Sequence, residues 1–291
     1  MEDRKVEEST KKYAEGHELL MKADYRRARQ AFEEAIRLDP KNAKAYFGKA
    51  NALFGMQEIE KAFKEMERAL GIDPNDEEIL DTYGAYLYNL ARYKDALDVT
   101  ERLLQIDPEN PSYWHKKALA LEASEEPLKA DEAYDKAIEL DPTDVMVFKD
   151  KGTMLEQIKD LAGALDAFKK AAMLVPNDTY FLDCQAQLLG RLDRFEDALK
   201  AFEAALAIDP TDEYAINGRA ATLSKLGRSE EALALFEEMI AKNPKNPFSW
   251  DGKAFALRML GRTDEAEKAD AEAKRLWREE EKSAPGTFGN A

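Results

Sequence analysis

Apolar and small residues recur along the chain at an interval of 34 residues, and within each interval they follow helical spacing. In residues 111–144, Trp114 and Ala118 are four residues apart, and so are Ala130 and Tyr134. Residues spaced three, four or seven apart share one face of a helix. A small residue on such a face lets a partner helix approach closely. Each interval therefore predicts two amphipathic helices that pack together.

Seven prolines mark the expected end of the second helix in successive intervals. Each lies 34 residues after the one before, and aspartate precedes the proline at five of the seven positions. Because proline lacks an N–H group and disfavours the helical conformation of the preceding residue, the helix ends there. The seven are Pro40, Pro74, Pro108, Pro142, Pro176, Pro210 and Pro244. This regularity indicates an internal repeat of antiparallel helix pairs.

The period divides the chain into three regions. We expect residues 1–8 to be an N-terminal extension, residues 9–280 to hold eight repeats, and residues 281–291 to be a disordered tail. The repeats are predicted at residues 9–42, 43–76, 77–110, 111–144, 145–178, 179–212, 213–246 and 247–280.

Polar residues replace apolar ones at both ends of the array. Lys11 and Glu18 occupy positions of the first repeat that are mostly apolar in the later repeats. Asp270 and Lys274 do the same in the second helix of the last repeat. Terminal repeats of a solenoid need a polar outer face, because they have a neighbour on one side only. We therefore expect both ends to be capped and the eight repeats to form a whole array.

This spacing of bulky, small, alanine and proline positions resembles the tetratricopeptide repeat, a helix–turn–helix unit of 34 residues. The resemblance extends over all eight repeats without an insertion or a deletion. It implies an all-α fold, namely a right-handed superhelical solenoid of antiparallel helix pairs. It also implies a concave groove, lined by the first helices, that binds peptides or partner proteins.

The composition limits what the chain can bind. Its 291 residues include 59 acidic and 43 basic residues, which gives a formal charge of −16. Nucleic acids and anionic membranes are bound through Lys and Arg, so we expect neither as a partner. No apolar run reaches the ~20 residues of a membrane helix, and the first residues lack an apolar signal region. These features predict a soluble, cytoplasmic protein.

No group of residues has the spacing of a catalytic or metal site. His17 and His115 lie in different repeats, and Cys184 is the one cysteine. We therefore expect no catalytic residue, no metal and no cofactor. The alternative is an enzyme that uses Glu122 and Glu156, which hold the same position in adjacent repeats. A solvated pair of carboxylates is the more common explanation of such a pattern.

By the resemblance, the second, fifth, ninth, twelfth and thirteenth residues of each repeat face the groove. Tyr180, Tyr214 and Phe248 occupy the second position of the last three repeats, and we expect them to anchor a ligand. The same part of the groove is expected to carry Phe255, Arg191, Lys225, Arg258 and Asn217. The alternative is that the second-position aromatic residues only fill contacts between neighbouring repeats.

A second aromatic patch is expected near the N-terminus, on the first helices of the first two repeats. Its candidate ligand-binding residues are Tyr13, Phe47, Asn51 and Phe54.

These features together predict a non-enzymatic scaffold that binds a peptide or a partner protein in the groove. Three basic residues in the last three repeats, Arg191, Lys225 and Arg258, favour an acidic ligand. They outnumber the two acidic groove residues there, Asp183 and Asp251. Self-association into a homo-oligomer is the alternative, with a helix of one copy in the groove of another.

Overall fold

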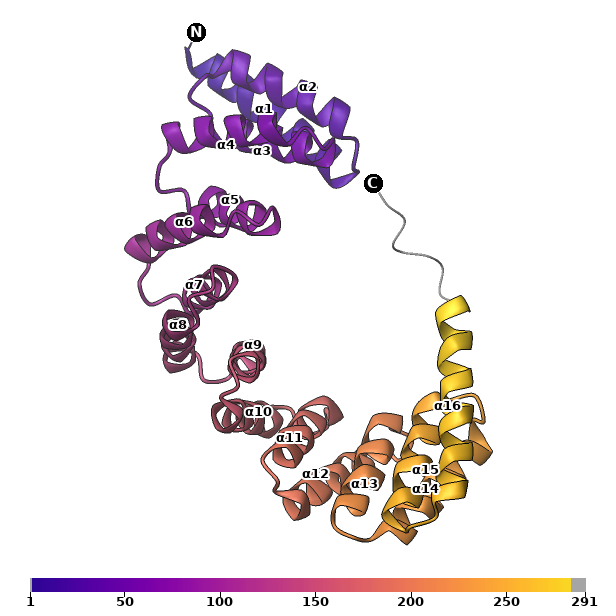
Figure 1. Ribbon diagram of the computed structural model, residues 1–291. Coiled ribbons are helices and arrows are strands. Elements are labelled where there is room, and N and C mark those ends of the chain that lie inside the picture. The colour runs from indigo at the N-terminus through magenta and orange to yellow at the C-terminus, as the bar shows by residue number, and fades with distance from the viewer. Residues whose placement is uncertain (1, 284–291) are drawn as a thin grey trace. The chain divides into compact units, whose positions relative to one another are not determined.

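The structure is a computed structural model that describes residues 2–283. Within that range the chain folds into helices joined by short turns, without a strand (Figure 1). The helices belong to two compact parts, one ending at Pro142 and the other beginning at Thr143. The all-α fold of successive helix pairs predicted from the sequence is confirmed.

The first part contains four helix pairs, each made of neighbours in the sequence. Their bounds are α1 (Glu2–Met21), α2 (Tyr25–Leu38), α3 (Ala43–Gly55), α4 (Ile59–Ile72), α5 (Glu77–Asn89), α6 (Tyr93–Ile106), α7 (Pro111–Ala123) and α8 (Pro127–Leu140).

The second part repeats the arrangement with four further pairs. They are α9 (Val145–Gln157), α10 (Leu161–Leu174), α11 (Thr179–Arg191), α12 (Phe195–Ile208), α13 (Glu213–Lys225), α14 (Ser229–Lys242), α15 (Pro247–Met259) and α16 (Thr263–Ser283).

Local sequence signals place the helix ends. Asp212 begins α13, and its side chain accepts hydrogen bonds from the backbone N–H groups of Tyr214 and Ala215. Such caps satisfy donors that have no partner inside the helix. At the other end, Asp39 follows α2 with an extended backbone, φ −135° and ψ 97°. The proline after it requires this conformation, so the helix stops where the sequence predicts.

The turn inside each pair has one residue in the left-handed conformation. These residues recur every 34 positions and are Ala23, Gln57, Ala91, Glu125, Lys159, Asp193, Gly227 and Gly261. Glycine adopts a positive φ without steric penalty, whereas a residue with a Cβ is strained there. The backbone geometry therefore follows the repeat even where the residue type does not.

Small residues allow the two helices of a pair to pack closely. The alanine that recurs in every second helix is buried at all eight positions. These are Ala28, Ala62, Ala96, Ala130, Ala164, Ala198, Ala232 and Ala266.

Aromatic rings of second helices pack against glycines of first helices. The ring of Phe32 in α2 lies so close to α1 and α3 that a Cβ added to Gly16 or Gly48 would come within 2.7 or 2.4 Å of it. Phe236 of α14 has the same relation to Gly252 of α15, at 2.2 Å. A ring of one pair therefore fills space that reaches to the first helix of the next pair.

The two ends of the described range differ from the expectation for the extension and the tail. Helix α1 begins at Glu2, so residues 2–8 continue the first helix of the array. Helix α16 ends at Ser283, so the prediction of disorder is wrong for residues 281–283. The reason is a run of good helix formers without a proline, supported by the ion pair of Arg275 with Glu279. Residues 284–291 of the predicted tail lie outside the described residues.

None of the helices in the described range combines the length and the apolar character that crossing a membrane demands.

Candidate functional site

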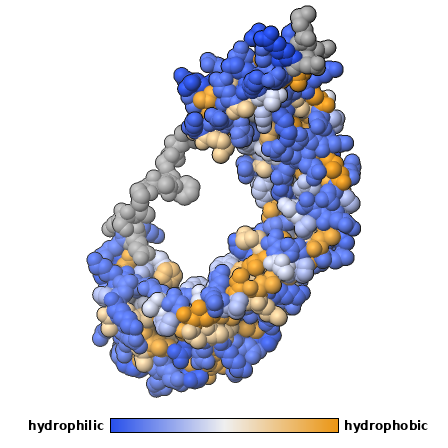
Figure 2. Space-filling view, turned by 180° about the vertical axis from the view of Figure 1, so that it is seen from behind, coloured by the Kyte–Doolittle hydropathy of each residue, from blue (hydrophilic) through white to orange (hydrophobic). Residues whose placement is uncertain are grey.

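Three aromatic side chains have equivalent exposed positions in the second part. Tyr180, Tyr214 and Phe248 are the second residues of α11, α13 and α15, and these residues are 45%, 51% and 59% exposed. The backbone N–H of each donates a hydrogen bond of 3.0 Å to the Asp or Asn residue that caps its helix. The rings therefore leave the backbone at the same point of three successive helix pairs. Figure 2 shows that apolar patches interrupt a surface that is otherwise mostly hydrophilic.

Two of these rings have an aromatic neighbour. Tyr180 meets Phe181 edge to face, with ring centroids 5.1 Å apart. Phe248 meets Trp277 of α16 in the same way at 4.6 Å. Trp277 in turn donates its indole N–H to Asp251 at 2.9 Å. Phe248 thus also helps to hold the last helix, while about half of its surface stays accessible.

The surroundings of Tyr180 and Tyr214 are poor in positive charge. Burial, followed by the nearby Cys184, raises the pKa of Tyr180 to about 12. Burial raises the pKa of the Cys184 thiol to about 11, so the thiol is protonated at neutral pH and is a poor nucleophile. Nearby acidic residues, among them Glu156, act in the same direction on both groups, and the shifts give no sign of an activated group.

A buried carboxyl lies beneath this row. Asp183 of α11 is 8% exposed, and burial together with the neighbouring Asp212 raises its pKa to about 7. Asp212 accepts hydrogen bonds from the N-terminus of α13 and from the hydroxyl of Thr179, at 3.0 Å. The raised pKa of Asp183 means that this buried carboxyl retains its proton up to nearly neutral pH.

The basic residues that were expected to favour an acidic ligand are largely paired within the chain. Arg191 forms an ion pair with Glu156 of α9, and Arg258 forms one with Asp270 of α16. Lys225 lies over the ring of Phe255, with its Nζ 5.3 Å from the ring centroid. Two of the three cations are therefore neutralised, one by a groove residue of the preceding repeat and one by Asp270, which lies outside the groove positions. The local excess of positive charge that favoured an acidic ligand is absent.

The other two expected residues of this group are partly buried. Phe255 is half-buried on α15 beneath Lys225. Asn217 is half-buried on α13, where its amide nitrogen donates to the carbonyl oxygen of Glu213 at 2.8 Å. Both are therefore only partly accessible to a ligand.

The second patch, predicted near the N-terminus, is largely core. Phe47 is 6% exposed and belongs to the same apolar cluster as Leu80 of α5, so its assignment to a ligand-binding surface is wrong. A large apolar side chain at this position is covered by the next helix pair. Phe54 is half-buried, and its ring stacks on that of Tyr86 with centroids 3.5 Å apart.

The remaining residues of that patch are half-buried as well. The ring of Tyr13 lies 5.9 Å from that of Phe32, centroid to centroid, and packs at the edge of the core between α1 and α2. The side-chain oxygen of Asn51 is buried and has no hydrogen-bond partner within the described residues.

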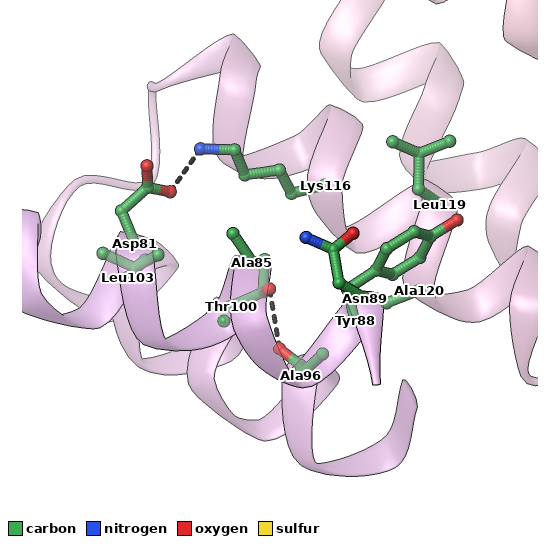
Figure 3. A pocket seen from close by; sticks show the side chains of 11 residues that line it. Asp81, Ala85, Tyr88, Asn89, Ala96, Thr100, Leu103, Lys116, Leu119 and Ala120 are labelled. Carbon is green, nitrogen blue, oxygen red and sulfur yellow. Dashed lines mark hydrogen bonds and ion pairs between the residues drawn. The ribbon is translucent and has the colours of Figure 1, made fainter. Parts of the chain in front are cut away.

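The sequence interpretation missed a cavity in the first part. It has a volume of about 150 Å³ and lies among α5, α6 and α7 (Figure 3). Its lining consists of Asp81, Gly84, Ala85, Tyr88, Asn89, Ala96, Thr100, Leu103, Lys116, Leu119 and Ala120. Thr100 stands eight residues before Pro108, where four other helix pairs carry phenylalanine. This departure from the repeat was the signal available in the sequence.

The carboxylates considered for catalysis have separate partners. Glu122 accepts a hydrogen bond of 2.8 Å from the hydroxyl of Tyr134, and Glu156 is paired with Arg191. Among residues 2–283 no three His, Cys, Asp or Glu side chains are grouped as a metal site requires. These contacts give the two glutamates structural roles within their own parts.

Comparison with protein families accounts for the repeat. Three models of the tetratricopeptide repeat match residues 13–77, 111–144 and 191–254, which together make up more than half of the chain. The chain belongs to the tetratricopeptide repeat family. Comparison with curated proteins gives no match.

Solved structures agree with this assignment. The C-terminal part of a tetratricopeptide repeat protein from Cytophaga hutchinsonii aligns with a TM-score of 0.64 at 18% identity, covering 72% of this chain and 87% of that one. PilF of Pseudomonas aeruginosa aligns with a TM-score of 0.55 at 19% identity, covering 72% and 96%.

A third structure is that of YrrB, described as a tetratricopeptide repeat protein with an unusual peptide-binding site. It aligns with a TM-score of 0.52 at 24% identity, covering 66% of this chain and 98% of that one. At these identities the likeness concerns the fold alone. The tetratricopeptide repeat fold is typical of interaction scaffolds, and no catalytic family is indicated by the comparisons.

Proposed function

We propose that this tetratricopeptide repeat protein is a non-enzymatic scaffold that binds an extended or helical segment of a partner protein. The proposed binding surface is the exposed side of α11, α13 and α15. The observation that carries the proposal is the row of Tyr180, Tyr214 and Phe248 at one position of three successive helix pairs. Exposed aromatic residues are frequent anchors in protein interfaces.

Two further observations support a peptide-binding role. The ion pairs of Arg191 and Arg258 mean that neither cation is available as an unpaired charge for a ligand. Binding would therefore depend mainly on the burial of rings and would vary little with salt. YrrB, a similar fold, is a tetratricopeptide repeat protein for which a peptide-binding site is described.

The proposal is tested with a peptide library displayed on phage and selected against the full chain. A triple variant, in which Tyr180, Tyr214 and Phe248 are changed to alanine, should bind the selected peptides at least ~30-fold more weakly. That factor corresponds to the loss of one anchor of about 2 kcal/mol. Dissociation constants measured by fluorescence anisotropy give the comparison.

A matched control removes an exposed apolar side chain of a second helix in the same part. Met173 of α10 is among the most exposed of these, and Met173→Ala should leave peptide affinity unchanged. Circular dichroism should show full helical content in both proteins. Undiminished binding by a folded triple variant would refute the proposal, as would a large fall in its melting temperature, which would assign the rings to the contacts between helix pairs.

Self-association is the second candidate, because the same exposed rings would serve a second copy of the chain. Sedimentation equilibrium over a hundredfold range of concentration separates the two candidates. A monomer at all concentrations excludes self-association, while a dimer that the triple variant abolishes excludes the partner-protein proposal. The cytoplasmic location and the exclusion of nucleic acid remain predictions from the sequence.

A further inference from the structure

The cavity among α5, α6 and α7 lies where other helix pairs hold an aromatic ring. Thr100 of α6 has the register of Phe32, Phe202 and Phe236, each eight residues before a proline of the repeat. The rings of Phe202 and Phe236 lie within 2.3 Å of where a Cβ on the following first helix would be. A threonine is too short to reach that far, so the space beside it is not filled from α6, although Lys116 of α7 brings a side chain to the position that is glycine in those pairs.

The residues that line the cavity stand at the same positions of the repeat as those around the filled sites. Gly84 corresponds to Gly16, and Lys116 corresponds to Gly48, the two residues against which the ring of Phe32 packs. In place of a ring, the nearest side chain to a Cβ on Gly84 is that of Val99, at 3.3 Å. The cavity therefore lies at the register where other pairs hold a ring, with Lys116 forming one of its walls.

Three polar residues of the lining already have partners within the chain. The hydroxyl of Thr100 donates to the carbonyl oxygen of Ala96 at 2.8 Å, and Lys116 forms an ion pair with Asp81, as the dashed lines in Figure 3 mark. The remaining wall is mainly apolar and includes Leu103 and Leu119. A cavity of about 150 Å³ with such a lining holds a benzene ring. Water has few partners there and is a poor occupant.

The cavity is reached from the side of the first helices. Ala85 and Asn89 of α5 are exposed, and Tyr88 and Leu119 are half-buried beside them. In Figure 3 the side chains of Tyr88, Asn89 and Leu119 stand together at one end of the cavity, away from the Asp81–Lys116 pair. The site thus combines an apolar interior with a polar rim that can hydrogen bond to a peptide backbone.

We infer that this cavity binds the phenyl ring of a phenylalanine side chain from a partner peptide. The ring replaces the one that helix α6 lacks. A phenyl group is the occupant because the cavity has the volume of a benzene ring and a mainly apolar wall. Phenylalanine is also buried at this register as Phe168 of α10, where the facing residue of the next first helix is Cys184 and not glycine. The peptide part of this inference rests on the proposed function, whereas the affinity for a phenyl ring is a property of the cavity alone.

The first experiment uses toluene as the probe and the full chain as the protein. A proton NMR titration that follows the methyl signals of the protein should show saturable toluene binding in the millimolar range for the native protein. Thr100→Val keeps the size of the side chain and should keep the binding. Thr100→Phe places a ring in the cavity and should weaken toluene binding at least tenfold.

A second variant that fills the cavity is included in case Thr100→Phe does not fold. Thr100→Met introduces the residue that Met66 provides at the same register of α4, where it is fully buried. It should weaken toluene binding like Thr100→Phe while the helical content stays intact. Toluene binding that is absent in the native protein, or equal in Thr100→Val and Thr100→Met, would overturn the inference.

The second experiment uses the phage-selected peptides with the same variants. Peptides that lose affinity at least tenfold on Thr100→Met should contain phenylalanine, and its replacement by alanine should cause the same loss. If toluene binds as expected but no selected peptide loses affinity on Thr100→Met, the cavity binds a free ring but not the phenylalanine of a partner peptide. If no peptide is selected at all, the proposed function fails, and the toluene titration still decides whether the cavity is a ring site.

Discussion

The first and third helix pairs have the same spacing of residues but different interiors. Between α1, α2 and α3 the ring of Phe32 fills the space against Gly16 and Gly48. Among α5, α6 and α7 the same space is a cavity beside Thr100, and Lys116 stands at the position that corresponds to Gly48. The repeat therefore sets where a site lies, while the size of one side chain sets whether the site is filled.

The difference also bears on two positions that are sixteen residues apart, one in the second helix of a pair and one in the first helix of the next pair. Where the first of these positions is Phe202 or Phe236, the second is Gly218 or Gly252. A Cβ on either glycine would come within 2.2 Å of the ring, so a larger residue does not fit without a shift of the ring. Phe168 is also buried although Cys184 stands at the second position, so glycine accompanies the ring in some pairs and not in all. Where the ring is absent, as at Thr100, the second position accepts a long side chain.

The largest effect should come from emptying the filled site. Phe32→Ala should destabilise the protein by about 3–5 kcal/mol, because the ring is fully buried and its removal leaves a cavity. Thr100→Ala should change the free energy of unfolding by less than ~1 kcal/mol, since the space beside it is already empty. Urea denaturation followed by circular dichroism measures both. Similar losses for the two variants would mean that the two sites do not differ as described.

A medium effect should come from adding one methyl group beside each site. Gly48→Ala should destabilise by about 1–2 kcal/mol, because the added Cβ meets the ring of Phe32 at 2.4 Å. Gly84→Ala should be neutral or stabilising, because Val99 at 3.3 Å needs to give way only slightly and alanine favours the helix. The melting temperatures of the two variants test this prediction. A lower melting temperature for Gly84→Ala than for Gly48→Ala would contradict it.

The smallest effect concerns the aspartate at the fifth residue of two repeats. Asp81 is half-buried and paired with Lys116, whereas Asp183 is buried beside Asp212 and its pKa is raised to about 7. Because the folded protein binds this proton more tightly than the unfolded chain, stability should fall as the pH rises from about 4 to about 7. Asp183→Asn should remove that fall and stabilise the protein at pH 8 by on the order of 1 kcal/mol.

Melting temperatures between pH 5 and pH 8 provide the test. Asp81→Asn is the control, and it should lose at most ~1 kcal/mol, since it breaks one partly exposed ion pair. The native protein and this control should show the same slope against pH. A slope that persists in Asp183→Asn would assign the titration to another group.

The helices and their pairing can be read from the sequence because they depend on local rules. Proline ends a helix wherever it stands, and a spacing of 34 residues puts the same apolar faces together in each pair. The exposure of Tyr180, Tyr214 and Phe248 followed from the same register. These properties repeat because each helix pair meets its neighbours in the same way.

The charge of the surface, the burial of Phe47 and the cavity depend on which particular side chains meet between helices. Arg258 is neutralised by Asp270, a residue of another helix that the groove positions did not include. Phe47 is buried because the next helix pair covers it, although its register indicates a surface position. Because the interior is closely packed, each site depends on the volumes of all the side chains around it. Which side chains these are is decided only when the helices come into contact.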